Sequence, residues 1–158
     1  AQEYAVKRWY DLDVEIEELP FTGLDDATHT ISGTGSLVGR INDVVDSAYV
    51  YTGDAFIDGD ELVFAIDQEI TNGLGVGNIF TTGRFDLATG TGTQTVVDCL
   101  GPALLCSDID PGETSIYTAA ELEASDPDEI TWRVDLAIVL GGAFGTADSA
   151  SGFTATRN

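Results

Sequence analysis

Two polar side chains interrupt rows of apolar residues that are otherwise typical of the inside of a β-protein. Arg8 stands between Val6 and Tyr10 in an alternating stretch, and Gln68 interrupts a similar row further along the chain. A buried guanidinium is costly unless it is paired. Arg8 could therefore anchor the carboxylate or carbonyl of a ligand. Alternatively, Arg8 could lie at the rim of the fold or pair with an internal acid.

Aromatic residues of the alternating segments could wall a pocket around these polar groups. The predicted ligand-binding residues are Arg8, Tyr10, Phe64, Gln68 and Trp132. Small-molecule sites usually combine apolar walls with a few polar groups that fix the orientation of the ligand. The ligand that this set predicts is a small apolar molecule.

Acidic turns are the second feature that could do chemistry. Asp98, Asp108, Asp110 and Glu113 surround a short segment bounded by two cysteines, and SDIDPGE places three of these carboxylates near turn carbonyls. Oxygen ligands of this kind suit Ca²⁺. Because the spacing is not that of an EF-hand, calcium binding is a hypothesis beside the plain reading as turn acids. GDAFIDGDE at 53–61 is a weaker candidate of the same kind.

Other reaction chemistries find little support. The chain has no G-x-S-x-G segment, and its single histidine, His29, lies in a polar stretch where we expect an exposed, non-catalytic side chain at a strand start. GLGVGN predicts a hairpin rather than a phosphate loop, because neither a helical pattern nor Lys-Ser/Thr follows it. Among 28 acidic residues a carboxylate pair arises by chance. A non-enzymatic role is favoured; any reaction would be cyclase-like or isomerase-like, without a metal or nucleotide cofactor.

Alternation of apolar and polar residues predicts that β-strands position these groups. The stretch EYAVKRWYDLDVEIEEL predicts one long N-terminal strand within residues 1–19, with one wet face that includes Trp9. Further strands are expected at 29–41, 47–56, 61–70, 78–87, 92–99, 114–123 and 129–140. A short helix around YTAAELEAS is the only competing interpretation.

Turn chemistry separates the expected strands and favours one fold class. DGDE, TNGLGVGN, DPGE and SDPDE lie between strands, as do all four prolines. Seven to nine short strands with a wet face predict an all-β, single-domain antiparallel β-barrel over residues 1–158, with a β-sandwich as the alternative. Abundant glycine favours the sharp curvature of a small barrel.

The charge of the chain limits its partners. Six Lys and Arg residues oppose 28 Asp and Glu residues, which gives a formal net charge of -22. Nucleic acids and anionic membranes are not expected as partners, because they are bound through cationic side chains. The longest apolar runs are far too short to span a membrane. A surface of this charge also suits solubility in a salty medium.

The start of the sequence and its cysteines predict export. The chain begins AQEYAV and contains no methionine, as expected of a mature chain that has lost a signal peptide. A secreted, extracellular or periplasmic location follows from this expectation. Cys99 and Cys106 predict a local disulfide worth about 2.5 kcal/mol. A metal site at these cysteines is the weaker alternative, since no second Cys pair is present.

One recurring segment resembles a known family. TTGRFDLATGTGT at 81–93 and, more loosely, GGAFGTADSASG at 141–152 share the order Gly-x-Phe-x-x-Ala followed by small residues, and SGTGSLVG at 32–39 is a fragment of it. This pattern resembles the glycine-rich hairpins of the allene oxide cyclase and dirigent-like β-barrels. The resemblance implies a barrel with an apolar cavity for cyclising or steering a small molecule. No catalytic residue of that family can be matched here.

Three functions remain open at this point. The leading one is an exported acidic barrel that binds or shapes a small apolar molecule. The second is a structural subunit of an extracellular filament or surface layer, assembled when the N-terminal strand adds to a neighbouring subunit and helped by calcium. The third is a carbohydrate-binding module in which exposed Trp9, Tyr49 or Tyr51 stack on sugars.

Overall fold

The computed structural model describes most of the chain. Its backbone is described at 3–10, 15–22, 24–40, 46–73, 75–101, 106, 109–141 and 145–158, and its side chains in these ranges except 3–10, 15–22 and 138–141. The described part contains no helix long and apolar enough to cross a bilayer.

Eleven β-strands make up the regular structure of these ranges. They are β1 (Glu3–Tyr10), β2 (Glu15–Thr22), β3 (His29–Gly39), β4 (Ser47–Asp58), β5 (Glu61–Asn72), β6 (Gly75–Asp86), β7 (Thr91–Leu100), β8 (Thr114–Thr118), β9 (Ala120–Glu123), β10 (Glu129–Gly141) and β11 (Gly145–Arg157). The strands expected from residue 29 onward are present, and the segment that competed as a helix forms β8 and β9.

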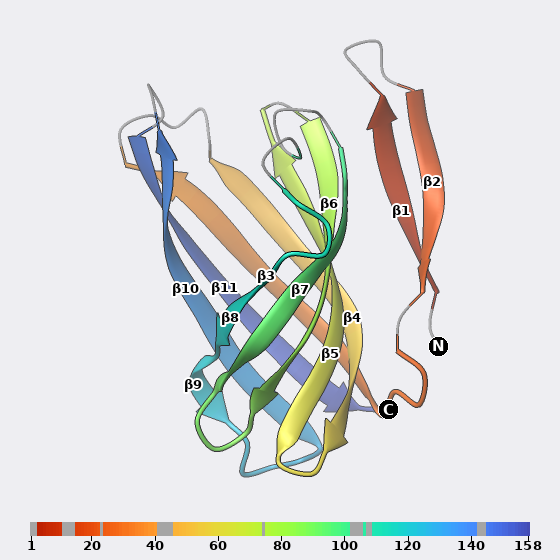
Figure 1. The fold of residues 1–158 in the computed structure, drawn as a ribbon, viewed down its shortest axis with the longest axis vertical. Coiled ribbons are helices and arrows are strands. Elements are labelled where there is room, and N and C mark those ends of the chain that lie inside the picture. Colours follow the sequence, from red (N-terminus) through yellow and green to blue (C-terminus); the bar gives the residue numbers. More distant parts are fainter. Residues whose placement is uncertain are drawn as a thin grey trace.

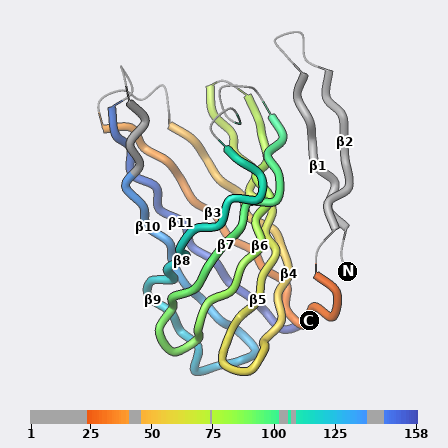
Figure 2. Tube along the Cα trace, viewed as in Figure 1, coloured from red at the N-terminus to blue at the C-terminus, as the bar shows by residue number. Residues whose placement is uncertain are grey.

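Nine of the strands form one antiparallel sheet that curls into a nearly closed barrel (Figure 1). The order is β8-β7-β6-β5-β4-β3-β11-β10-β9. Strands that follow each other in the chain therefore pair in this sheet, except β8 and β9, and β11 pairs with β3. The two edge strands, β8 and β9, follow each other in the chain with only Ala119 between them. The prediction of an antiparallel barrel is therefore confirmed (Figure 2).

The N-terminal strands form a separate two-stranded sheet. In this hairpin Glu3 pairs with Thr22 and Tyr10 pairs with Glu15. The expectation of one long strand over residues 1–19 is therefore wrong, because Glu3–Tyr10 and Glu15–Thr22 are two strands that pair antiparallel. Alternation alone could not reveal this reversal, since the apolar rows of both strands have the same period.

The barrel is built from the alternation that the sequence displays. In β11, for example, Ala147, Ser149, Ser151, Phe153 and Ala155 are buried, and most residues between them are partly or fully exposed. Turns occur within all four predicted turn segments, and Gly59 and Gly112 adopt positive φ there. These positions favour glycine because a side chain would be strained.

The two Gly-x-Phe-x-x-Ala segments both lie at hairpins, but they sit differently on them. In the first, Gly83 and Phe85 belong to β6 and Ala88 lies in the turn; in the second, Ala147 lies within β11 after the turn. The first glycine is needed for close packing, since a Cβ at Gly83 would lie 2.6 Å from the ring of Phe64. In the first segment the glycine therefore has a structural basis in ring packing.

Candidate functional site

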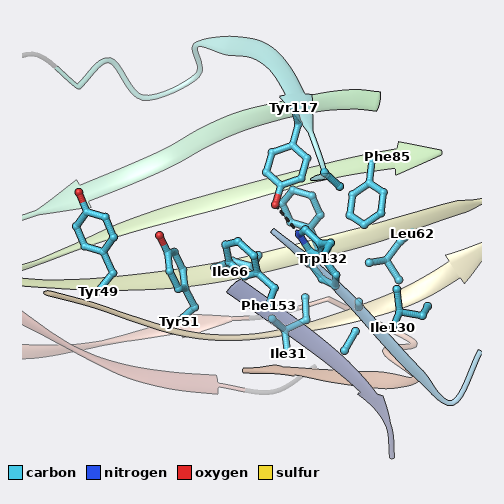
Figure 3. Close-up of a cluster of buried hydrophobic side chains, with 14 of the residues drawn as sticks. Ile31, Tyr49, Tyr51, Leu62, Ile66, Phe85, Tyr117, Ile130, Trp132 and Phe153 are labelled. Carbon is cyan, nitrogen blue, oxygen red and sulfur yellow. Dashed lines mark hydrogen bonds between the residues drawn. The ribbon is translucent and has the colours of Figure 1, made fainter. Parts of the chain in front are cut away.

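One end of the barrel, here called the closed end, has its interior occupied by aromatic rings (Figure 3). Phe85 lies 5.1 Å from Trp132 and 5.8 Å from Tyr117 between ring centroids, and Trp132 stacks on Phe153 at 5.3 Å. Phe64 lies 5.0 Å from Tyr117. These spacings are typical of well-packed aromatic pairs.

A buried hydrogen bond ties this cluster together. The indole Nε1 of Trp132 donates to the hydroxyl of Tyr117 at 2.9 Å, and both residues are almost completely buried. Burial raises the pKa of Tyr117 well above its usual value, and the hydrogen bond from Trp132 opposes this rise. The phenol is therefore neutral, and it accepts a hydrogen bond from the indole N–H without placing a charge in the core.

The predicted pocket residues Phe64 and Trp132 both belong to this packed cluster. Each side chain is 1% exposed and packs within the buried hydrophobic core. Gln68 is half-buried and lies on the same strand as Phe64, four residues further along. That separation corresponds to about 13 Å along a strand. The structure thus brings Phe64 and Trp132 together and places Gln68 apart from them.

Arg8 and Tyr10 complete the predicted set. Both lie in β1, where the structure describes the backbone only. Arg8 is opposite Glu17 in the register of the N-terminal hairpin. Their part in a ligand site stays a prediction.

The interior towards the other end carries more polar groups. The hydroxyls of Tyr51 and Ser151 form a hydrogen bond of 2.6 Å. Burial raises the pKa of Tyr51 to about 12, with the hydrogen bond to Ser151 acting against the rise, and burial also raises the pKa of Tyr49. Gln68 is the register partner of Tyr51 and shares its face of the sheet. Both tyrosines are 7% exposed. The expectation that they form exposed sugar platforms is therefore wrong.

The wall of the barrel is incomplete at this second end, here called the open end. β9 pairs with β10 only at Thr131 and Arg133, although β10 continues to Gly141. Leu136 is opposite the buried Ser149, so its side chain belongs to the inner row, yet it is 55% exposed. Trp132, four residues earlier in the same row, is 1% exposed. The barrel therefore changes from closed to open between these two residues.

The facing edge of β7 ends its pairing early as well. β8 pairs with β7 only from Thr91 to Thr95, and Val96 then exchanges backbone hydrogen bonds with Gly112 and Glu113. Within the described ranges, no strand pairs with this side of β7 beyond Val96. We call the region between Val97–Leu100 of β7 and Val134–Gly141 of β10 the wall opening.

Exposed acids lie on both sides of the wall opening. Asp98 is on β7, Asp110 and Glu113 lie in the segment before β8, and Asp135 is on β10; all four are exposed. Asp98 accepts a hydrogen bond from the backbone N–H of Cys99. The described side chains include no group of three or more His, Cys, Asp and Glu that could hold a metal ion. Asp108 lies outside the described residues, so the calcium hypothesis stays a prediction.

The disulfide beside these acids is present. Cys99 and Cys106 are joined, with their Cα atoms 5.7 Å apart. The prediction of a local disulfide is confirmed. It fixes the end of β7 at the wall opening.

His29 is buried, and the expectation of an exposed imidazole is wrong. Its Nε2 donates to the carbonyl of Pro127 at 2.8 Å, and its Nδ1 lies 2.7 Å from the hydroxyl of Thr28. A carbonyl can only accept, so Nε2 carries a hydrogen in this arrangement. The ring joins the start of β3 to the turn before β10, which is a structural role.

The outer face of β4–β6 is also buried, which sequence reasoning missed. Asp67 and Asn78 point away from the barrel interior, and Asn78 Nδ2 donates to Asp67 Oδ1 at 2.8 Å. Burial raises the pKa of Asp67 to about 6; the hydrogen bond from Asn78 lowers it and the charge of Glu69 raises it further. β1 lies against β6 on this part of the barrel. The available signal was the uninterrupted apolar run LVFAI in β5, which is typical of a strand covered on both faces.

A shallow groove of about 740 Å³ crosses the outside of the barrel between β9 and β4. Hydroxyl and small side chains of β3, β4, β10 and β11 line it, together with Glu121, Glu123 and Arg133. The aromatic residues beneath it, Tyr51 and Trp132, are buried members of the inner row. No exposed aromatic face lines this groove, so nothing in it favours sugar stacking.

Comparison with models of protein families, with curated proteins and with solved structures finds no match to this chain. The function must therefore be inferred from the residues themselves.

Proposed function

We propose that this protein is a structural subunit of an extracellular assembly, built when the N-terminal strand of one copy adds to the sheet of another. The observation that carries the proposal is the wall opening, where the inner-row residue Leu136 is 55% exposed beside an edge of β10 that lacks a described partner strand. An exposed strand edge is a template for pairing with another chain.

The closed end supports a structural role over a container for ligands. Phe64, Phe85, Tyr117, Trp132 and Phe153 occupy the interior there with one another's rings. A ligand at the predicted residues Phe64 and Trp132 would have to displace this packing, at a cost of several kcal/mol.

Charge also supports an ordered mode of association. All four basic residues of the barrel are arginines that form ion pairs within it, namely Arg40, Arg84, Arg133 and Arg157. The rest of the barrel surface is strongly acidic, so unspecific contact between copies is opposed by repulsion. Association then requires a specific complementary element.

Sedimentation velocity over a range of concentrations tests the proposal. The full chain is expected to form assemblies whose size grows with concentration, and a variant lacking residues 1–17 is expected to stay monomeric. Near-ultraviolet circular dichroism of the buried tryptophan and tyrosines checks that the truncated barrel remains folded. A full chain that stays monomeric at every concentration and salt level would contradict the proposal.

Binding of a small apolar molecule is the second candidate, favoured by one observation. Gln68 is a half-buried polar residue beside Tyr51 on the inner face of the open end. A small molecule held there would meet Gln68 and the hydroxyls of Tyr51 and Ser151 as polar anchors. Native mass spectrometry of protein from its own source tests this: a monomer with a discrete organic mass supports it, and a bare polypeptide mass argues against it.

A further inference from the structure

We infer that the acceptor site of this assembly is the wall opening, and that its occupant is β1 of a second copy. This inference rests on the proposed function and goes beyond it by naming both partners of the contact.

The first support is the shape of the opening. Among the described residues, no strand pairs with this edge of β10 from Val134 to Gly141, and β1 is a strand of the same length, 8 residues. Because β1 pairs with β2 along one edge, its other edge could pair with β10 and extend the sheet there. Its inward side chains would cover Leu136, which is otherwise an inner-row leucine open to water. Removing an exposed leucine side chain from water favours association.

The second support is charge complementarity. β1 contains Lys7 and Arg8 against a single acid, Glu3; among the described strands it is the only one in which Lys and Arg outnumber Asp and Glu. The opening is flanked by Asp98, Asp110, Glu113 and Asp135, all of them exposed. Within the described part of the chain, the first three of these acids form no ion pair. A positively charged strand is attracted by these acids, whereas the acidic rest of the surface is repelled by them.

The alternation of β1 places its groups suitably for this site. Tyr4, Val6, Arg8 and Tyr10 form one row of the strand and Lys7 belongs to the other. With the first row facing inward over Leu136, Lys7 faces outward towards the acidic rim. That choice allows only registers in which the first row faces inward, because a slip by one residue would exchange the two rows.

Mixed cross-linking tests the contact in the full-length chain. The only two cysteines of the chain are joined to each other, so an introduced cysteine is the sole free thiol. Val6→Cys and Leu136→Cys are made in separate chains and mixed under mild oxidation, with EDTA present to exclude divalent cations. A disulfide-linked heterodimer is expected from the mixture, and neither variant alone should give a comparable yield of dimer.

Two substitutions make the inference independent of the cross-link. Leu136→Asp is expected to weaken association at least about tenfold, while Val38→Asp, an equally exposed valine on the outer row of β3, leaves it unchanged. Lys7→Glu is expected to weaken association and Lys7→Arg to preserve it. Because Lys7 lies outside the barrel, its effect does not depend on whether Leu136→Asp folds.

The outcomes separate this inference from the proposed function. A chain that never associates overturns both. A chain that associates without the mixed disulfide, and whose association is unaffected by Leu136→Asp and Lys7→Glu, keeps the structural role but overturns the named donor and acceptor.

Discussion

The two ends of the barrel use the same strands for different purposes. At the closed end the inner row of β10 buries Ile130 and Trp132 at 0% and 1% exposure, and at the open end the same row leaves Leu136 at 55%. The difference arises in the neighbouring edge, because β8 and β9 together span only the closed end. The extent of the two short edge strands therefore decides which part of the barrel has a closed, packed interior and which part has an open wall.

The edge strand β9 is irregular close to the wall opening. Glu121 is a non-glycine residue with a φ of 49°, and the register between β9 and β10 shifts next to it, between Thr131 and Arg133. Such irregularities are frequent at the rims of barrels. Pairing continues past the shift to Ala120 and stops there, where Ala119 connects β9 to β8.

The largest expected contrast between the two ends comes from truncating their inner-row side chains. Trp132→Ala should lower the free energy of unfolding by about 4 kcal/mol, since it removes a fully buried ring and leaves the hydroxyl of Tyr117 without its donor. Leu136→Ala should cost less than about 1 kcal/mol. Urea denaturation measures both; equal losses would mean that the ends do not differ in packing.

A pair of glycines sharpens the comparison between tightly packed and open positions. A Cβ at Gly92 would lie 1.8 Å from the carbonyl oxygen of Arg84, whereas a Cβ at Gly152 meets nothing within 4 Å. Gly92→Ala should therefore destabilise the barrel by about 3 kcal/mol and Gly152→Ala by less than about 0.5 kcal/mol. Thermal unfolding of the two variants checks this, and a tolerated Gly92→Ala would show that the closed end can relax.

Removal of the disulfide tests how much the open end contributes to global stability. Replacing both Cys99 and Cys106 by serine should lower the free energy of unfolding by about 2 kcal/mol, because the short closed loop no longer restrains the unfolded chain. A loss as large as that of Trp132→Ala would place the open end within the cooperative core, and would break the comparison.

The smallest effect concerns the buried acid on the outer face of β5. The folded protein holds a proton on Asp67 up to about pH 6, above the ordinary value of 3.8, so its contribution to stability is lost as pH rises through 6. Asp67→Asn should match the wild type at pH 4 and be more stable by about 1 kcal/mol at pH 8, a discounted figure because solvent reaches part of the carboxyl. Denaturation at both pH values checks this; a constant difference would rule out titration of Asp67.

Much of the fold was predictable from the sequence, because alternation and turn chemistry are local signals. They predicted the antiparallel barrel, the turn segments and the inner-row places of Phe64 and Trp132. The disulfide followed from the spacing of Cys99 and Cys106.

What could not be predicted depends on contacts distant in the chain. His29 is buried because the carbonyl of Pro127, 98 residues away, accepts from its ring. Asp67 and Asn78 are buried on an outer row, which depends on where the N-terminal hairpin lies. The position of the wall opening depends on where β9 stops pairing with β10. No residue type in β10 indicates this position.

Hydrogen exchange of β10 tests the central claim most directly. The amides of residues 134–141 that point away from β11 should exchange rapidly in dilute, monomeric protein and become protected when it assembles. The amides of Ile130 and Trp132 should stay protected in both states. Protection of the whole strand in the monomer, or unchanged exchange of residues 134–141 on assembly, would contradict the view that the wall opening receives a strand from another copy.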